Sequence, residues 1–131
     1  MNENETRKTN YAAIDIGSNA VRLLIKEIKE EQGKAHFSKV LMLRVPLRLG
    51  FDVFDIGKIS EKKEKNMIRL MKAFRHLMKI YDVKHCRACA TSAMRDAKNG
   101  MDIIKQMKKR LVCISILSTD RKRLRLYTTI M

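Results

Sequence analysis

The segment Asp15-Ile16-Gly17-Ser18-Asn19 is the first that could do chemistry. An apolar run delivers one carboxylate to a tight turn, where glycine lets backbone N–H groups approach an anion closely. Ser18 and Asn19 can add side-chain donors to phosphate oxygens, and Asp15 can hold Mg²⁺ or its coordinated water. The segment therefore predicts a phosphate-binding loop with a metal at its edge.

The same glycine, serine and asparagine are also common in ordinary hairpin turns, so this alternative stays open. The flanking residues favour a hairpin in either case, with strands over 11–16 and 20–28. An aspartate inside an otherwise apolar strand is harder to explain by a turn alone.

A second candidate is the segment from Ala90 to Asp96, which contains Thr91, Ser92 and Arg95. Hydroxyl groups at a strand end, followed by an arginine with its planar fork of donors, suit a phosphate site. A helix cap followed by a solvated arginine is the alternative, and the local residues alone favour it.

The sequence His85-Cys86-Arg87-Ala88-Cys89 suggests a metal site at first sight. It lies in a predicted strand, where Cys86 and Cys89 point to opposite faces because they are three residues apart. One such pair provides too few ligands for structural zinc. We interpret these cysteines as buried free thiols.

The elements that must position these residues follow from the apolar periodicity. We predict a third strand over 35–45, a loop marked by Pro46, Gly50 and Gly57, and a helix from Ser60, its N-cap, to Tyr81. Next come a strand over 83–91, a polar connection over 91–99, a helix over 100–110 and a strand over 112–117. The order βββ-α-β-α-β is an α/β arrangement.

Composition limits the possible partners. The 29 lysines and arginines outnumber the 14 aspartates and glutamates, and the formal charge of +15 should attract polyanions. No run is apolar enough to span a membrane, and the N-terminus lacks a signal-peptide core. Three cysteines without a secretory signal fit a reducing compartment, so we expect a cytoplasmic protein. Nine methionines suit an adaptable core or an apolar face that awaits a partner.

The chain divides into a flexible lead over 1–10, a domain over 11–118 and a basic, irregular tail over 119–131. The tail carries Arg121, Lys122, Arg123 and Arg125 but no interleaved aromatic platform and no helix-turn-helix pattern. We therefore expect no specific nucleic-acid partner.

Four segments in this order resemble the N-terminal part of the exopolyphosphatase / guanosine pentaphosphate phosphohydrolase (Ppx/GppA) family. The resemblance covers about residues 11–118 and includes the amphipathic helix. Its sequence motifs are Ala12-Ala13-Ile14-Asp15-Ile16-Gly17-Ser18-Asn19-Ala20-Val21-Arg22-Leu23, Arg48-Leu49-Gly50 with Gly57-Lys58-Ile59-Ser60, and Ala90-Thr91-Ser92-Ala93-Met94-Arg95-Asp96-Ala97-Lys98-Asn99.

The resemblance implies an incomplete ribonuclease-H-like half-domain of the actin / Hsp70 / sugar-kinase superfamily. It implies removal of terminal phosphate from polyphosphate or a guanosine polyphosphate, with Mg²⁺. Asp15 would lie near the metal, the residues Gly17, Ser18 and Asn19 would cradle phosphate together with Thr91 and Ser92, and Arg95 would bind the phosphate under attack.

The chain departs from the family near Ser118. Family members usually carry an acidic Glu-Glu-Ala segment there, and only Asp120 can stand in for the glutamate that prepares the attacking water. Surrounding cations would depress its basicity. The second, glycine-rich phosphate loop and the second domain do not appear in the sequence. We hypothesise a shifted or interrupted reading frame near Ser118, which downstream DNA without a Glu-Glu-Ala-like continuation in another frame would refute.

The sequence thus favours an inactive fragment of a phosphoanhydride hydrolase. The alternatives are a non-catalytic polyanion-binding module and a relative of the sugar or acetate kinases. We expect self-association through an exposed sheet and Met-rich apolar surface.

Overall fold

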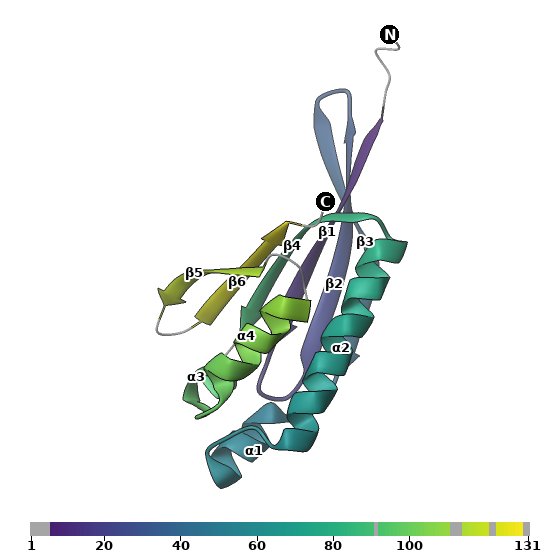
Figure 1. Cartoon of the computed structure of the whole chain (residues 1–131). Helices are drawn as coiled ribbons and strands as arrows, with labels where there is room; N and C mark the ends of the chain where they lie inside the picture. Colours follow the sequence, from purple (N-terminus) through teal and green to yellow (C-terminus); the bar gives the residue numbers. More distant parts are fainter. Residues whose placement is uncertain (1–5, 91, 111–113, 121–122, 130–131) are drawn as a thin grey trace.

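The computed structural model describes residues 6–90, 92–110, 114–120 and 123–129, with side chains over 6–90, 93–107 and at Lys109. A six-stranded sheet in the order β3-β2-β1-β4-β6-β5 forms one layer, and helices form the other (Figure 1). The elements along the chain are β1 (Arg7–Ile16), β2 (Val21–Glu31), β3 (Lys34–Val45), α1 (Leu49–Ile56), α2 (Glu61–Ile80), β4 (Val83–Ala90), α3 (Ser92–Asp96), α4 (Gly100–Arg110), β5 (Ile114–Asp120) and β6 (Arg123–Thr129).

The first three strands form the predicted antiparallel meander. Along β1, the buried Ile14 and Ile16 alternate with exposed residues, and along β2 the buried Leu23 and Ile25 flank the half-buried Leu24. This period of two is the pattern of a sheet with one face on the core. The far end of the β2–β3 hairpin projects beyond the helix layer (Figure 1).

Helix α2 confirms the predicted helix and its cap. The Ser60 side chain accepts a hydrogen bond from the backbone N–H of Lys63 at 3.4 Å. One face buries Met67, Met71, Phe74 and Met78 against the sheet, as the helical spacing predicts. Charged residues occupy the solvent side.

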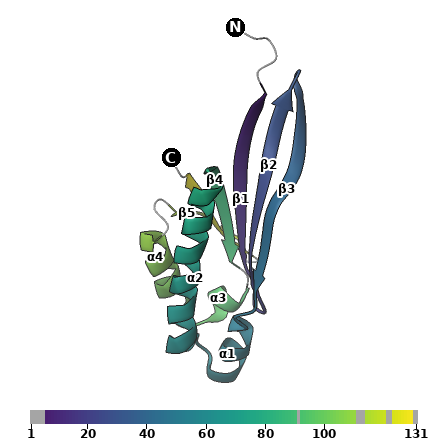
Figure 2. The same cartoon turned by 90° about the vertical axis from the view of Figure 1, so that its right-hand side faces the viewer.

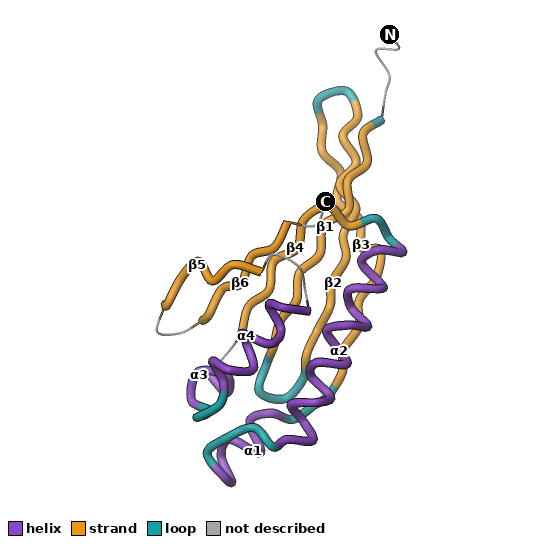
Figure 3. Tube along the Cα trace, in the orientation of Figure 1, coloured by secondary structure: helices purple, strands orange, loops and turns teal. Residues whose placement is uncertain are grey.

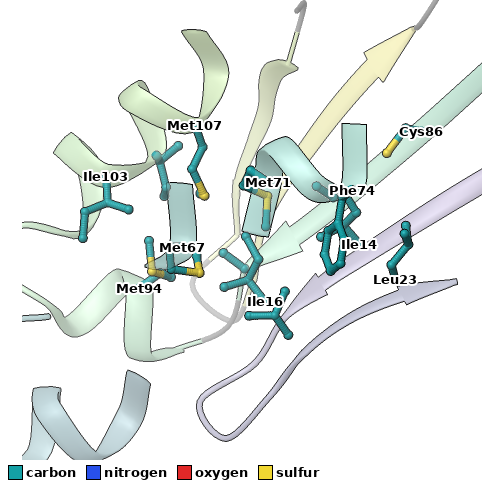
Figure 4. Packing of buried hydrophobic residues seen from close by; sticks show 14 of the residues in the cluster. Ile14, Ile16, Leu23, Met67, Met71, Phe74, Cys86, Met94, Ile103 and Met107 are labelled. Carbon is teal, nitrogen blue, oxygen red and sulfur yellow. The ribbon is translucent and has the colours of Figure 1, made fainter. Parts of the chain in front are cut away.

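The core lies between the sheet and the helices (Figure 4). Phe74 packs over Ile14 from α2, and methionines from three helices fill the space beside them. The buried methionines are Met67, Met71, Met78, Met94 and Met107. Unbranched, polarisable side chains fit irregular gaps between short elements. More than half of the nine methionines lie in the core, which is one of the two roles that the sequence predicted for them.

Two predicted connections contain helices. Residues 46–59 were predicted as a loop, but α1 occupies Leu49–Ile56 and ends at Gly57, whose φ of 72° makes it a left-handed C-cap. Glycines can cap a helix as well as mark a loop, and the local pattern does not separate the two roles. The polar connection over 91–99 contains the five-residue helix α3.

Both ends of the described chain are more regular than predicted. Strand β1 begins at Arg7, so the flexible lead is wrong for residues 7–10. The irregular tail is wrong for Arg123–Thr129, which form β6 and pair antiparallel with β4. Leucine at 124 and 126 alternates with arginine at 123 and 125, a strand period that the basic composition obscures.

Helices α2 and α4 lie on the same side of the sheet, and no described element covers the other side (Figure 2). We call this second side the open face. Its side chains include Tyr11, Ala13, Leu24 and His85, which alternate with the buried residues of the same strands. The predicted order βββ-α-β-α-β is retained, with α1, α3 and β6 added.

Candidate phosphate-binding site

Strands β1 and β4 are parallel neighbours that end at the same level. Their terminal residues, Ile16 and Ala90, are paired in register. The chain leaves β1 toward β2, whereas the continuation of β4 forms α3 and α4 before reaching the other side of the sheet. When connections diverge in this way, the carboxyl ends of the strands are the usual ligand position in an open α/β sheet.

The loop after β1 is held in a tight turn. The backbone N–H of Gly17 donates to the carbonyl of Ala20 at 3.0 Å. A Cβ atom at position 17 would lie only 2.9 Å from that carbonyl oxygen, so the turn requires glycine. Asp15 lies just before this turn, exposed, at the level of Cys89 in β4.

The next two residues of the loop use their carbonyls to hold α1. Gly50 N–H donates to the Ser18 carbonyl at 2.8 Å, and Arg48 N–H donates to the Asn19 carbonyl at 2.9 Å. The Ser18 and Asn19 side chains are exposed. The fold therefore fixes the loop by its main chain and leaves the two polar side chains accessible to a ligand.

A second set of contacts attaches the segment after β4 to the same end. Lys98 N–H donates to the Gly57 carbonyl at 3.1 Å. The Asn99 side chain donates to the Ile59 carbonyl at 2.8 Å and accepts from the Ile59 N–H at 3.0 Å. The β1–β2 loop, α1 and α3 consequently gather at one end of the sheet (Figure 3). All four sequence segments that carried the family resemblance meet there.

Arg95 lies in α3 at this end, with its side chain 41% exposed. Its Nε lies 3.5 Å from a carboxylate oxygen of Asp96. Within the described side chains, no hydrogen bond or ion pair joins Arg95 to Asp15 or to the loop. Thr91 lies outside the described residues, and for Ser92 only the backbone is described, as the first residue of α3.

The donor set at Asp15 suits a magnesium ion only in part. The described residues contain no group of three or more histidine, cysteine, aspartate or glutamate side chains that could form a complete metal cage. Mg²⁺, however, commonly uses one or two carboxylates and takes its other ligands from water and substrate phosphates. Asp15 fits that mode, in which the substrate completes the site.

Asp120, which the sequence suggested as a stand-in for the residue that activates water, ends β5. Because Thr119 pairs with Leu124 and Leu124 pairs with Ala90, Asp120 lies near the level at which β1 and β4 end. Strand β6 nevertheless separates β5 from β4. Two strand spacings of about 4.8 Å therefore lie between Asp120 and the end of β4.

Sequence analysis missed the residues that support the loop, Asp52 and Lys63. Asp52 accepts hydrogen bonds from Lys63 Nζ at 2.6 Å and from the Ser60 N–H at 3.0 Å. Burial by itself would raise the pKa of Asp52, but the hydrogen bonds from Lys63 and Ser60 and the lysine charge together lower it. The sequence does show an aspartate eight residues before Ser60, the N-cap of α2. Its role as a hydrogen-bond acceptor for Ser60 and Lys63 becomes visible only once residues 49–56 are known to form a helix.

The CxxC segment has the predicted alternation. Cys86 is buried on the helix side and Cys89 is half-buried on the other, and both are free thiols. Burial raises the pKa of Cys86 to about 12. Cys89 is thus less buried than predicted, because the open face gives it little cover.

Comparison with known proteins identifies the relatives of this fold. A sequence profile described as the Ppx/GppA phosphatase family matches residues 24–128. The chain belongs to the Ppx/GppA phosphatase family. The match continues past Ser118 and takes in nearly all of β6.

Solved Ppx/GppA proteins have the same fold. The Aquifex aeolicus family member is 31% identical, with a TM-score of 0.72 over 82% of this chain and 34% of that chain. An exopolyphosphatase from Cytophaga hutchinsonii is 27% identical, with a TM-score of 0.67 over 78% of this chain and 31% of that chain. The chain is therefore a partial domain of the actin-like type, as the resemblance implied.

Curated relatives are also much longer. Bifunctional 3-dehydroquinate synthase/phosphatase of Fusobacterium nucleatum is 32% identical over an alignment of 117 residues that covers 82% of this chain and 18% of that protein. Exopolyphosphatase 1 of Mycobacterium tuberculosis is 29% identical over 96 residues, 73% of this chain and 27% of that protein. The chain spans about a third or less of the relatives it matches.

Proposed function

We propose that this chain supplies the first phosphate-binding loop of a phosphoanhydride hydrolase that removes terminal phosphate from polyphosphate or a guanosine polyphosphate. The observation that carries the proposal is the in-register ending of β1 and β4, which puts the Gly17 loop and the Arg95 helix at one end of the sheet. The Ppx/GppA family membership supports the same class of reaction.

In this proposal each residue has a separate role. Asp15 holds Mg²⁺ or its water, and the bound ion would neutralise phosphate charge. The loop residues Gly17, Ser18 and Asn19 cradle phosphate oxygens, with Thr91 and Ser92 as further donors. Arg95, whose guanidinium is exposed, binds the phosphate under attack. Its weak contact with the neighbouring Asp96 costs little to replace, since exposed ion pairs contribute little stability.

We expect little or no turnover from the chain alone. Phosphoryl transfer depends on donors and cations that surround the phosphate. The residues assigned here supply one side of that shell, and the position of Asp120 beyond β6 suits a water-activating base poorly. Weak affinity for phosphate or polyphosphate is the property we expect this chain to retain.

The test is orthophosphate release and polyphosphate binding, both with Mg²⁺. We would compare the unchanged chain with Asp15→Asn, Arg95→Ala and the control Arg69→Ala, whose side chain is exposed on α2. The proposal expects roughly tenfold weaker binding for Arg95→Ala, close to 1.4 kcal/mol, and no change for Arg69→Ala. Release that Arg95→Ala abolishes would show that the half-domain assembles a working site and that our expectation of low turnover is wrong.

A non-catalytic polyanion-binding module is the second candidate, favoured by the formal charge of +15. It predicts binding that salt abolishes and that Asp15→Ala and Arg95→Ala leave unchanged. A kinase relative would instead transfer phosphate from ATP to a small substrate, so the same samples should be assayed with ATP as donor.

Location is a further proposal. The free thiols Cys86 and Cys89 fit a reducing compartment, and we propose the cytoplasm. None of the helices that the structure describes is long and apolar enough to cross a membrane.

A further inference from the structure

Arg95 lies on a helix that is too short to be stable by itself. Helix α3 has five residues, and isolated helices of that length do not persist in water because the first turn fixes several residues for a single hydrogen bond. Arg95 is the last residue but one of this helix. Its position therefore depends on what fixes the chain directly after α3.

Asn99 fixes that part of the chain through both groups of its side-chain amide. The Nδ2 atom donates to the Ile59 carbonyl at 2.8 Å, and the Oδ1 atom accepts from the Ile59 N–H at 3.0 Å. The Lys98 N–H adds a third hydrogen bond, to the Gly57 carbonyl at 3.1 Å. We call these three hydrogen bonds the clamp. Asn99 is half-buried and Ile59 is buried, so water competes weakly for the two amide bonds.

The other side of the clamp leads to the phosphate loop. Ile59 is the second residue after Gly57, the C-cap of α1. At the N-terminal end of α1, backbone N–H groups donate to the carbonyls of Ser18 and Asn19 in the loop. A short series of hydrogen bonds thus runs from the loop, through α1 and the clamp, to Asn99 and α3.

Packing alone does not fix α3 in this way. Ala93 and Met94 are buried in the core and hold α3 against the sheet. Apolar burial is non-directional, however, whereas hydrogen bonds have a preferred distance and angle. The ion pair between Arg95 and Asp96 joins two residues of the same helix and sets no distance to the loop. The clamp is therefore the directional contact that relates the last turn of α3 to α1.

We propose that Asn99 is a positioning residue for Arg95, and that the clamp sets the distance between the Arg95 guanidinium and the phosphate loop. The inference rests on the proposed function, in which the loop and Arg95 bind the same substrate. Asn99 itself contacts no phosphate. Its removal should abolish the contribution of Arg95 to binding and leave that of the loop, which the hydrogen bond from Gly17 to Ala20 holds independently.

A double-variant cycle tests this coupling. Calorimetry measures the binding of long-chain polyphosphate with Mg²⁺ to the unchanged chain, Asn99→Ala, Arg95→Ala and the double variant. Asn99→Ala should weaken binding roughly five- to tenfold, and adding Arg95→Ala to it should change binding by no more than about twofold, because coupled residues are not additive. Since Asn99→Ala leaves the net charge unchanged, a general loss of attraction for polyanions cannot explain the effect.

The salt dependence of binding gives a readout that a purely structural role would not change. Each phosphate contact that is lost reduces the release of counterions, so the affinity for a polyanion falls less steeply with salt. Arg95→Ala and Asn99→Ala should reduce this slope equally, although only the first substitution removes a charge.

Gln106→Ala is the matched control. The Gln106 side-chain amide joins α4 to α2 through a hydrogen bond to Glu64 at 3.1 Å, outside the clamp. Its removal should leave polyphosphate binding and the salt slope unchanged within about twofold, because the two sites share no partner. Circular dichroism and thermal unfolding establish that each variant is folded at the temperature of the binding measurement.

Asn99→Ser is a second variant in case Asn99→Ala does not fold. The Asn99 carbonyl accepts the Ile103 N–H at 3.1 Å, the first hydrogen bond of α4, so residue 99 occupies the cap position of that helix. Serine is a good N-cap but is too short to bond both backbone groups of Ile59. It should therefore keep α4 and lose the clamp, with the same weakening of binding as Asn99→Ala.

Four outcomes would overturn the inference. These are unchanged binding in Asn99→Ala, additive losses in the double variant, an equal loss in Gln106→Ala, and failure of both Asn99 variants to fold, which would make Asn99 a general stabilising residue. Unchanged binding in Arg95→Ala would refute the proposed role of Arg95 and the inference with it. A loss in Arg95→Ala without coupling to Asn99 would refute the inference alone, so the two failures are distinguishable.

Discussion

At the scale of residues, Lys63 joins two helices through three partners. Its Nζ donates to the Arg48 carbonyl at 2.8 Å and to Asp52 at 2.6 Å, and it lies 5.6 Å from the centre of the Phe51 ring. Arg48 has a φ of 54°, a left-handed conformation that a non-glycine residue adopts at a cost. The lysine thus stabilises the turn that brings α1 against the β1–β2 loop.

Asp52→Ala should lower the free energy of unfolding by about 2 kcal/mol at neutral pH, because it removes charge-assisted hydrogen bonds from a half-buried site. The folded-state pKa of Asp52 lies below its ordinary value. Its contribution is therefore complete above the unfolded-state pKa of about 4 and is lost as pH falls through the folded-state pKa. Urea denaturation at several pH values measures the difference between variant and unchanged chain.

The control is Asp55→Ala, an exposed carboxylate on the same helix, for which we expect a change within about 0.5 kcal/mol. A difference for Asp52→Ala that stays constant from neutral pH to well below 4 would contradict an electrostatic role.

The two described cysteines should differ in reactivity. Cys86 is 2% exposed and burial raises the pKa of its thiol to about 12, whereas Cys89 is half-buried. Because the thiolate is the nucleophile, a short iodoacetamide pulse should label Cys89 and spare Cys86. Trypsin cuts after Lys84, Arg87 and Arg95, so mass spectrometry assigns each label. Equal labelling of the two peptides in the folded chain would contradict the burial of Cys86.

At the scale of elements, the turn between α3 and α4 depends on close backbone packing. Gly100 N–H donates to the Ala97 carbonyl at 3.1 Å. A Cβ atom at position 100 would lie 1.8 Å from the Met94 carbonyl oxygen, and that atom belongs to the backbone. The two helices approach each other at a distance that only glycine permits.

Gly100→Ala should therefore cost about 2 kcal/mol or more of unfolding free energy, although alanine favours helix elsewhere. Met101→Ala, at an exposed neighbour in the same helix, is the control and should change stability by less than about 0.5 kcal/mol. Thermal and urea unfolding measure both, and a neutral Gly100→Ala would show that the turn relaxes freely.

At the scale of the whole molecule, two forces act on self-association in opposite directions. Apolar side chains such as Phe37 and Met42 are exposed on the sheet at 66% and 52% and favour association. The formal charge of +15 opposes it. Salt screens the charge within a Debye length of about 10 Å at 0.1 M and leaves the apolar attraction.

Light scattering at high protein concentration should accordingly show self-association that grows with salt. A clean monomer at every ionic strength would contradict the predicted self-association. Association that weakens with salt would show that charges, and not the exposed apolar side chains, drive it.

Local patterns by themselves determined a large part of this protein. The helical spacing of Met67, Met71 and Phe74 predicted α2, and Ser60 predicted its start, because both signals lie within one or two turns of chain. The alternation along β1 and β2 predicted a hairpin with Asp15 just before its turn. The family could be recognised from these segments because they keep their order and spacing.

Tertiary structure decided what these segments do together. No local sequence pattern predicts that β1 and β4 end side by side at Ile16 and Ala90. These residues are 74 positions apart, and their pairing depends on the crossover through α2. The helix at Leu49–Ile56 depends on its contacts with the Ser18 carbonyl and Lys63, and β6 depends on the free edge of β4. The open face likewise required the sheet order, because Leu24 of β2 lies beside Ala13 of β1 only when those two strands pair.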